Sequence, residues 1–305
     1  MKPALLLYPH ISAYPVLLLL GFFFGWLLCR SRAERYGIGK NHLDNIALLL
    51  PITGLFGARL FARLFYAKLP LLEALKVWEG EGLVFYGGFI ASALAVILYG
   101  VLRKMPLVRL LDCVAPSVAL GLAFGRVGCF LAGCCWGDVC IDHSQVASLR
   151  DQTVALRIQT FPAISPEQFP LAVQFPQKSA IYKQHVRHGL ISGAESKSLP
   201  VHPVQLYEAV LAALLCFYAA RPRLAKPGDV ALMVMVGYAL IRFATEFLRA
   251  DNKVYALGMT FSQVVSVYIL LGCAVIALLR QFLSRSDTPT TTEPVEEPAA
   301  VGNFR

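Results

Sequence analysis

The sequence predicts an all-α integral membrane protein with about seven transmembrane helices and one extracytoplasmic loop or head insertion. Hydrophobic residues make up 57% of the 305 residues, charged residues make up 15%, and the mean hydropathy is +0.59. Soluble domains have a much more polar composition. The apolar residues also gather into runs of roughly 20, the length of helix that crosses a bilayer core. Composition and run length therefore agree on a polytopic membrane protein.

Seven apolar runs are expected to span the membrane. They cover residues 12–30, 45–66, 83–102, 110–130, 204–220, 229–248 and 259–282. Only Lys2 precedes the first run as a cation, and no clean small-residue cleavage site follows it. We therefore expect the first run to be a retained helix and not a cleaved signal peptide.

Basic residues collect in alternate connections, which is typical of cytoplasmic loops. They follow the first, third, fifth and seventh runs, at Arg30, Arg32, Arg35, Lys40, Arg103, Lys104, Arg109, Arg221, Arg223, Lys226, Arg280 and Arg285. The opposite connections carry mixed charge. The N-terminus is therefore expected outside the membrane and the C-terminus in the cytoplasm.

Two segments depart from the apolar pattern. Residues 138–202 contain several prolines and mixed charge, and we expect them to form an extracytoplasmic loop, head or lid. Residues 284–305 have too few apolar side chains to pack and are expected to be a disordered cytoplasmic tail. The transmembrane domain then comprises residues 1–283.

The net charge of +9 does not indicate a nucleic-acid-binding protein. The basic residues lie at the membrane edges and are not interleaved with stacking aromatics along one soluble face. Anionic membrane lipid is the partner that this distribution favours, and no nucleic acid is expected.

Two arginines lie within apolar runs, where a charged side chain is costly unless it faces an anion, a partner or water. Arg126 lies near the end of the fourth run. Arg242 lies in the sixth run, and Glu246 follows it by one helical turn. Guanidinium groups match phosphate oxygens with forked donors, so the pair predicts a site for an anionic group.

Five of the eight cysteines lie in or beside the fourth run: Cys113, Cys129, Cys134, Cys135 and Cys140. Their spacing, C-x4-C-C-x4-C, lacks the C-x2-C pairs typical of zinc sites. We favour close packing as small apolar side chains, with a disulfide of Cys140 as the next interpretation. No metal and no nucleotide cofactor is expected, because no phosphate-binding glycine loop is present either.

Several strings, in this order, resemble the prolipoprotein diacylglyceryl transferase family from about residue 11 to residue 283. They are I-S-A-Y-P-V at 11–16, G-A-R-L-F-A-R-L-F-Y at 57–66, G-G at 87–88, D-C-V-A-P at 112–116, G-R-V-G-C-F-L-A-G-C-C-W-G at 125–137, H-P-V-Q-L-Y-E at 202–208, Y-x3-R-F-x2-E-F-x-R at 238–249 and T-F-S-Q at 260–263. Each string alone is weakly specific, whereas their shared order is strongly specific.

The resemblance implies a bacterial inner-membrane enzyme that joins a diacylglyceryl group to the cysteine of a prolipoprotein signal peptide. The thiol attacks a glycerol carbon of phosphatidylglycerol, glycerol phosphate leaves, and a thioether forms. The implied catalytic residues are Arg126, Arg242, Glu246 and Tyr86. The implied substrate-binding residues are Tyr14, Gly87, Gly88, Cys129, Gly137, His202 and Tyr238. No cofactor is implied.

Three positions depart from the family pattern. Tyr86 stands where the family has a histidine before the G-G pair, and Cys129 and Cys134 replace the signature's asparagine and glutamate. Tyrosine is a poor base at neutral pH, so Glu246, Glu208 and His202 are the candidate substitutes, with Glu246 favoured.

Three interpretations stay open beside one another. The first is a divergent member that makes the same transfer. The second is a paralogue that is non-catalytic or has changed its acceptor. The third is a membrane thiol-redox protein that uses Cys129, Cys134, Cys135 and Cys140. A transporter is less favoured, because the two halves show no inverted-repeat similarity.

Overall fold

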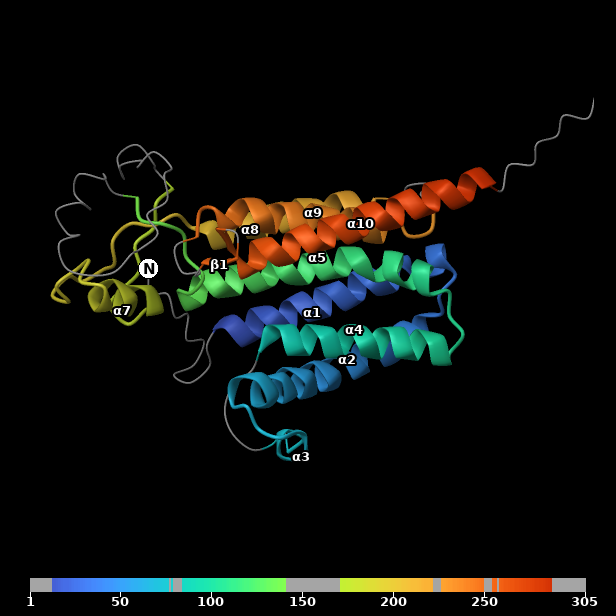
Figure 1. The fold of residues 1–305 in the computed structure, drawn as a ribbon, viewed down its shortest axis with the longest axis horizontal. Helices are drawn as coiled ribbons and strands as arrows, with labels where there is room; N and C mark the ends of the chain where they lie inside the picture. The colour runs from blue at the N-terminus through green and yellow to red at the C-terminus, as the bar shows by residue number, and fades with distance from the viewer. Residues whose placement is uncertain are drawn as a thin grey trace, which may run out of the picture.

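A computed structural model describes residues 13–76, 78, 84–140, 171–221, 226–249, 254–256 and 258–286. The long helices of these residues are α1 (Ala13–Arg32), α2 (Lys40–Phe61), α4 (Phe85–Leu102), α5 (Leu107–Ala132), α8 (Val204–Ala220), α9 (Asp229–Glu246) and α10 (Phe261–Ser286). They lie alongside one another in an elongated bundle (Figure 1). The prediction of an all-α membrane fold is confirmed.

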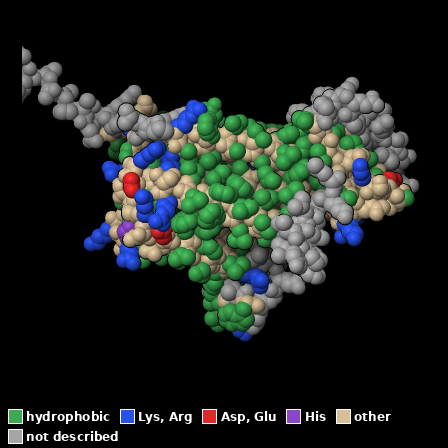
Figure 2. Space-filling view, turned by 180° about the vertical axis from the view of Figure 1, so that it is seen from behind, with side chains coloured by type: hydrophobic (Ala, Val, Ile, Leu, Met, Phe, Trp, Pro, Cys, Tyr) green, Lys and Arg blue, Asp and Glu red, His purple; other side chains and the backbone are tan. Residues whose placement is uncertain are grey.

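Four helical segments have the length and apolar composition to cross a membrane: Ala13–Tyr36, Lys40–Phe65, Leu107–Ala132 and Phe261–Leu283. The apolar helices Tyr86–Leu102 and Val204–Ala220 are shorter. The remaining helix, α9, carries Asp229, Arg242 and Glu246. Hydrophobic side chains cover the middle of the face seen in Figure 2, with Lys and Arg side chains at its left end. The protein is therefore a multi-pass membrane protein.

The short elements lie in the connections between these helices. They are η1 (Ala33–Tyr36), the π-helical η2 (Ala62–Tyr66), α3 (Leu71–Ala74), α7 (Ala180–Arg187), and the antiparallel strands β1 (Val254–Ala256) and β2 (Met259–Thr260). The helix α10 runs to Ser286, three residues past the expected domain boundary. The rest of the predicted tail lies outside the described residues.

Helix α5 is the centre of the bundle, because it contacts α1, α4, α8 and α9. Helix α2 instead packs closely on α4 through facing glycines. A Cβ on Gly87 would lie 2.2 Å from the Cβ of Phe61 and 2.5 Å from the carbonyl oxygen of Gly57. Small residues permit such close approach between membrane helices.

Asp112 on α5 joins the first turn of α9 to the centre of the bundle. Its carboxylate accepts hydrogen bonds from the backbone N–H of Gly228 at 2.6 Å and of Ala231 at 2.8 Å. Gly228 precedes α9 and has no side chain to cap it, so Asp112 supplies the cap from another helix. The buried Arg32 donates to the carbonyl of Ala220 nearby, at 2.7 Å. The end of α1 with η1, the N-terminal part of α5, the end of α8 and the start of α9 therefore lie together at one end of the bundle. This end is called the basic end below.

The opposite end carries a small head, seen beside α7 at the left of Figure 1. Trp136, Phe175, Ile181 and Val201 form its buried apolar cluster. Val139 and Val173 each pair with Val201 in isolated β-bridges. The predicted insertion 138–202 thus contains packed structure in its described part, whereas residues 141–170 lie outside the described residues.

Candidate functional site

Glu208 on α8 joins the two arginines that the sequence singles out. One carboxylate oxygen, Oε2, lies 2.5 Å from Nε of Arg126 on α5. The other, Oε1, accepts a hydrogen bond from Arg242 on α9 at 2.9 Å. The side chain of Glu208 is only 1% exposed, while those of Arg126 and Arg242 are 16% and 13% exposed. Each arginine side chain thus keeps a small exposed area beside a buried anion.

Further polar contacts extend this cluster. Arg242 also pairs with Glu246 at 2.6 Å and donates to the hydroxyl of Ser262 at 2.9 Å. Thr245 donates to Glu208 at 3.0 Å. Arg249 lies 3.9 Å from Glu246.

The ionic cluster is therefore Arg126, Arg242, Arg249, Glu208 and Glu246, with three cations against two carboxylates. Its net charge is positive, and the exposed parts belong to the cations. A partly desolvated site of this kind attracts an anion, because electrostatic interactions strengthen as water is excluded.

Four helix ends position the cluster, at the end of the bundle opposite the basic end. Arg126 lies near the end of α5, Glu208 near the start of α8, and Arg242 near the end of α9. The start of α10 is held by a reciprocal cap: the N–H of Thr260 donates to Gln263 at 3.0 Å, and the N–H of Gln263 donates to the hydroxyl of Thr260 at 3.3 Å. This cap places Ser262 against Arg242.

Several other residues predicted for the site lie beside it. Tyr238 lies close enough to Arg126 to interact with its guanidinium group. Tyr14 packs against Gly128, whose added Cβ would lie 3.0 Å from its ring. The N–H of Gly137 donates to the carbonyl of His202 at 3.0 Å, so these two residues are neighbours. Burial lowers the pKa of His202, which favours its neutral form.

Residues of the third predicted span have a different setting. Gly87 and Gly88 face the backbone of Gly57 and Gly54 on α2, where they permit close helix packing. The ring of Tyr86 contacts Phe261 edge-on, with centroids 5.6 Å apart. Phe261 precedes Ser262, so Tyr86 lies at the end of the bundle that carries the ionic cluster.

Sequence reasoning underrated Glu208. It appeared only among possible bases, whereas the structure makes it the residue that pairs with both arginines. The signal was present: a carboxylate in the apolar helix α8 needs a cation as much as Arg242 does. Which cation it pairs with is not readable from local sequence.

The structure divides the cysteines into three groups. All eight are free thiols. Cys29, Cys113, Cys216 and Cys273 are buried in the bundle, as the packing interpretation expects. Cys140 is buried and forms no disulfide, and burial together with Asp138 raises its pKa to about 12.

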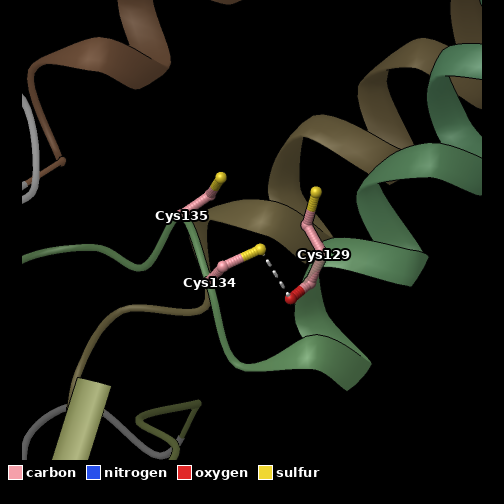
Figure 3. Close-up of side chains that lie close together, drawn as sticks. All are labelled: Cys129, Cys134 and Cys135. Carbon is pink, nitrogen blue, oxygen red and sulfur yellow. Dashed lines mark hydrogen bonds between the residues drawn. The ribbon is translucent and has the colours of Figure 1, made fainter. Parts of the chain in front are cut away.

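The sulfur atoms of Cys129, Cys134 and Cys135 lie within 4.8 Å of one another and are the donors best placed to hold a metal ion among the described residues. Figure 3 shows Cys129 on α5 with the sulfurs of Cys134 and Cys135 turned toward it. Cys134 also approaches the carbonyl of Cys129 at 3.6 Å. This group is called the thiol cluster below.

Comparison with known proteins gives a consistent result. A sequence model of the family described as prolipoprotein diacylglyceryl transferase matches residues 3–279. A phosphatidylglycerol–prolipoprotein diacylglyceryl transferase of Clostridium tetani is 29% identical over 287 residues, covering 92% of this chain and 98% of that relative. A relative of the same name from Photorhabdus laumondii is 30% identical over 271 residues, covering 85% and 84%. A third, from Paraburkholderia phytofirmans, is 34% identical over 216 residues, covering 68% and 65%.

Proposed function

The chain belongs to the prolipoprotein diacylglyceryl transferase family, and from this premise we propose that it transfers a diacylglyceryl group from phosphatidylglycerol to the cysteine thiol of prolipoproteins. The observation that carries the proposal is the convergence of Arg126 and Arg242 on one buried carboxylate within a match that spans nearly the whole chain. The product is a thioether.

The chemistry follows from the charges of the ionic cluster. The acceptor thiolate attacks the glycerol carbon, the carbon–oxygen bond to phosphate breaks, and glycerol phosphate leaves with the electron pair. Negative charge therefore grows on the phosphate, where preorganised guanidinium donors stabilise it most. Arg126 and Arg242 are the proposed phosphate-binding residues, and Glu208 fixes their side chains in place.

The remaining predicted residues have supporting roles in this proposal. Tyr238 lies beside Arg126 and is proposed to orient its side chain. Gly137 and His202 shape the end of the site below the head. Glu246 offsets part of the positive charge of Arg242 and Arg249. It is also the proposed acceptor of the proton that the prolipoprotein thiol loses.

The proposed location is the bacterial inner membrane, with the basic end in the cytoplasm. The N-terminus and the ionic cluster then face the outer leaflet side, where a signal peptide emerges from the membrane. Clustered cations at the basic end support this orientation, since lysine and arginine stay on the cytoplasmic side.

Complementation tests the proposed function. The chain is expressed in a bacterium depleted of its own transferase, and viability and the mass of a reporter lipoprotein are measured. We expect growth and a mass increase equal to one diacylglyceryl group. Failure of both, with the protein correctly inserted, contradicts the transfer and favours a non-catalytic or acceptor-switched paralogue.

A second candidate function rests on the thiol cluster, whose sulfurs are close enough for thiol exchange after small rotations. Replacing Cys129, Cys134 and Cys135 with alanine separates thiol-redox activity from transfer. If the protein is a thiol-redox protein, this variant loses all thiol–disulfide exchange with a reporter peptide, whether or not lipid is present.

A further inference from the structure

The thiol cluster is built by the end of helix α5. Gly133, at φ +67°, ends the helix in a left-handed conformation. Its N–H donates to the carbonyl of Phe130 at 3.1 Å, and the N–H of Cys134 donates to the carbonyl of Cys129 at 3.1 Å. This turn folds the chain back. Cys129 and Cys134, which have four residues between them in the sequence, therefore come together. Their spacing is then no argument against a metal site.

The backbone holds the cluster in an unusual conformation. Cys135 has φ +62°, a region that residues other than glycine seldom adopt. The segment around it is fixed on both sides. Gln205 on α8 donates to the carbonyl of Cys134 at 2.7 Å, and the N–H of Asp138 donates to the carbonyl of Leu248 at 2.8 Å. Strained backbone held by its surroundings is common at functional sites.

The geometry of the sulfur atoms suits a thiophilic cation. A tetrahedral zinc ion with zinc–sulfur bonds of about 2.3 Å places its sulfur ligands about 3.8 Å apart. The sulfurs of Cys129, Cys134 and Cys135 lie within 4.8 Å of one another, so small side-chain rotations suffice. Thiolates bind zinc well and bind magnesium or calcium poorly.

Charges near the cluster favour the thiolate form. Arg126 precedes Cys129 by three residues on α5, and Arg249 pairs with Gly137 in an isolated β-bridge two residues beyond Cys135. Three thiolates and one divalent cation leave one negative charge, which neighbouring guanidinium groups balance.

We propose that Cys129, Cys134 and Cys135 together bind one Zn²⁺ through three thiolates and leave its fourth coordination position open. Structural zinc sites have four protein ligands, whereas three ligands with an open position are typical of catalytic sites. Among the described residues, these three are the donors that come together as a possible metal-binding group.

The thiol cluster lies one helical turn from the ionic cluster along both α5 and α8. Cys129 follows Arg126 by three residues on α5. Gln205, which holds Cys134, precedes Glu208 by three residues on α8. An acceptor thiol entering at this end of the bundle reaches the open zinc position beside the phosphate-binding arginines.

This placement assigns the zinc a role, which rests on the proposed function. The acceptor thiol binds the open position and loses its proton to Glu246, the proton acceptor of the proposed function, so its sulfur becomes a thiolate. That sulfur then attacks the glycerol carbon, and the phosphate leaves with the electron pair of the broken carbon–oxygen bond. Zinc stays divalent throughout.

Cobalt binding tests the site without reference to activity. The full-length protein is purified in detergent, reduced, stripped with a chelator and titrated with Co²⁺. We expect one Co²⁺ per chain, with the ultraviolet charge-transfer absorption of thiolate–cobalt bonds, and displacement of Co²⁺ by Zn²⁺. Replacing any one of the three cysteines with alanine is expected to weaken binding at least tenfold.

Cys140→Ala is the matched control, because Cys140 lies close in sequence but outside the cluster. It is expected to bind Co²⁺ as the wild type does. Helical circular dichroism verifies that each variant is folded. The site is overturned if the reduced wild type gives no thiolate–cobalt absorption, or if the folded triple variant still gives it.

The role is tested separately, by lipid transfer with and without zinc. If stripping zinc lowers transfer at least tenfold and one equivalent of zinc restores it, the role is supported. Full transfer by the stripped protein overturns the role but leaves both the binding site and the transferase standing. Cobalt binding by a chain that transfers no lipid contradicts the proposed function alone.

Discussion

Oε2 of Glu208 lies 2.5 Å from Nε of Arg126, so a carboxylate from α8 is buried against a cation from α5. Since Arg242 also donates to Glu208, this single side chain organises both proposed phosphate-binding groups. The carboxylate of Glu208 offsets the repulsion between the two guanidinium groups.

Glu208→Gln is expected to lower transfer at least tenfold and to destabilise the protein. The amide removes the buried anion while nearly preserving its shape, and loss of one partner from a buried ion pair costs about 3–5 kcal/mol. Transfer rate and thermal unfolding in detergent are the measurements. Glu34→Gln is the control, because Glu34 pairs with Lys40 at the exposed basic end. Equal unfolding temperatures for wild type and Glu208→Gln contradict the proposed organising role.

Arg242→Lys is expected to keep expression near the wild-type level and to lower transfer tenfold to a hundredfold. Arginine bonds Glu208, Glu246 and Ser262 at once, and an ammonium group cannot reproduce this fork. Loss of one donor to developing charge typically costs a factor on the order of 100. Arg280→Lys, whose side chain contacts Asp229 at the basic end, is the matched control. Transfer at the wild-type rate in Arg242→Lys removes the assigned role.

Two glycines of the signature string are expected to differ in tolerance. A Cβ on Gly137 would lie 2.5 Å from Val204 and 2.7 Å from the carbonyl of His202, whereas a Cβ on Gly125 meets nothing within 4 Å. Gly137→Ala is therefore expected to lose about 1–3 kcal/mol of stability and most transfer. Gly125→Ala is expected to retain both. Denaturant titration and transfer assays measure the pair, and similar behaviour of the two variants contradicts the packing argument.

Asp112→Ala is expected to destabilise the bundle by about 1–2 kcal/mol, because it removes the cap of α9. The N–H groups of Gly228 and Ala231 then lose their acceptor. Thermal unfolding measures the loss, and hydrogen exchange is expected to rise at the first turn of α9. Because Asp112 lies at the basic end, KM for lipid is expected to stay unchanged. A changed KM with unchanged stability contradicts the capping role.

The head is expected to loosen as the pH falls from about 6.5 toward 4. Burial, aided by His188, lowers the pKa of His185 to about 4, and its Nδ1 accepts a hydrogen bond from the N–H of Leu199 at 3.3 Å. The unfolded head therefore binds more protons in this window. Stability is complete above pH 6.5 and decreases by up to about 1.4 kcal/mol per pH unit below it.

Limited proteolysis near α7 across this pH range measures the effect. His185→Asn retains an acceptor but does not titrate, so its cleavage is expected to vary less with pH. Identical pH profiles of the two proteins contradict the assignment to His185.

Apolar runs located the seven long helices that the described residues form, because membrane insertion depends on local composition along the chain. Arg126 and Arg242 were predicted as candidate site residues for the same reason, since a charge in an apolar run is visible without a partner. Glu208 was underrated, because its pairing with Arg242 spans 34 residues of sequence and depends on how α8 packs on α9.

Residue identity and local order were enough to predict the membrane class, the family resemblance and the two arginines within apolar runs. The packed fold was needed to show that Glu208 joins those arginines, that Gly87 and Gly88 face α2, and that Cys129 lies close to Cys134 and Cys135. The physical reason is that hydropathy is a local property of the chain, whereas ion pairs and thiol clusters depend on helix packing and on a single left-handed glycine turn.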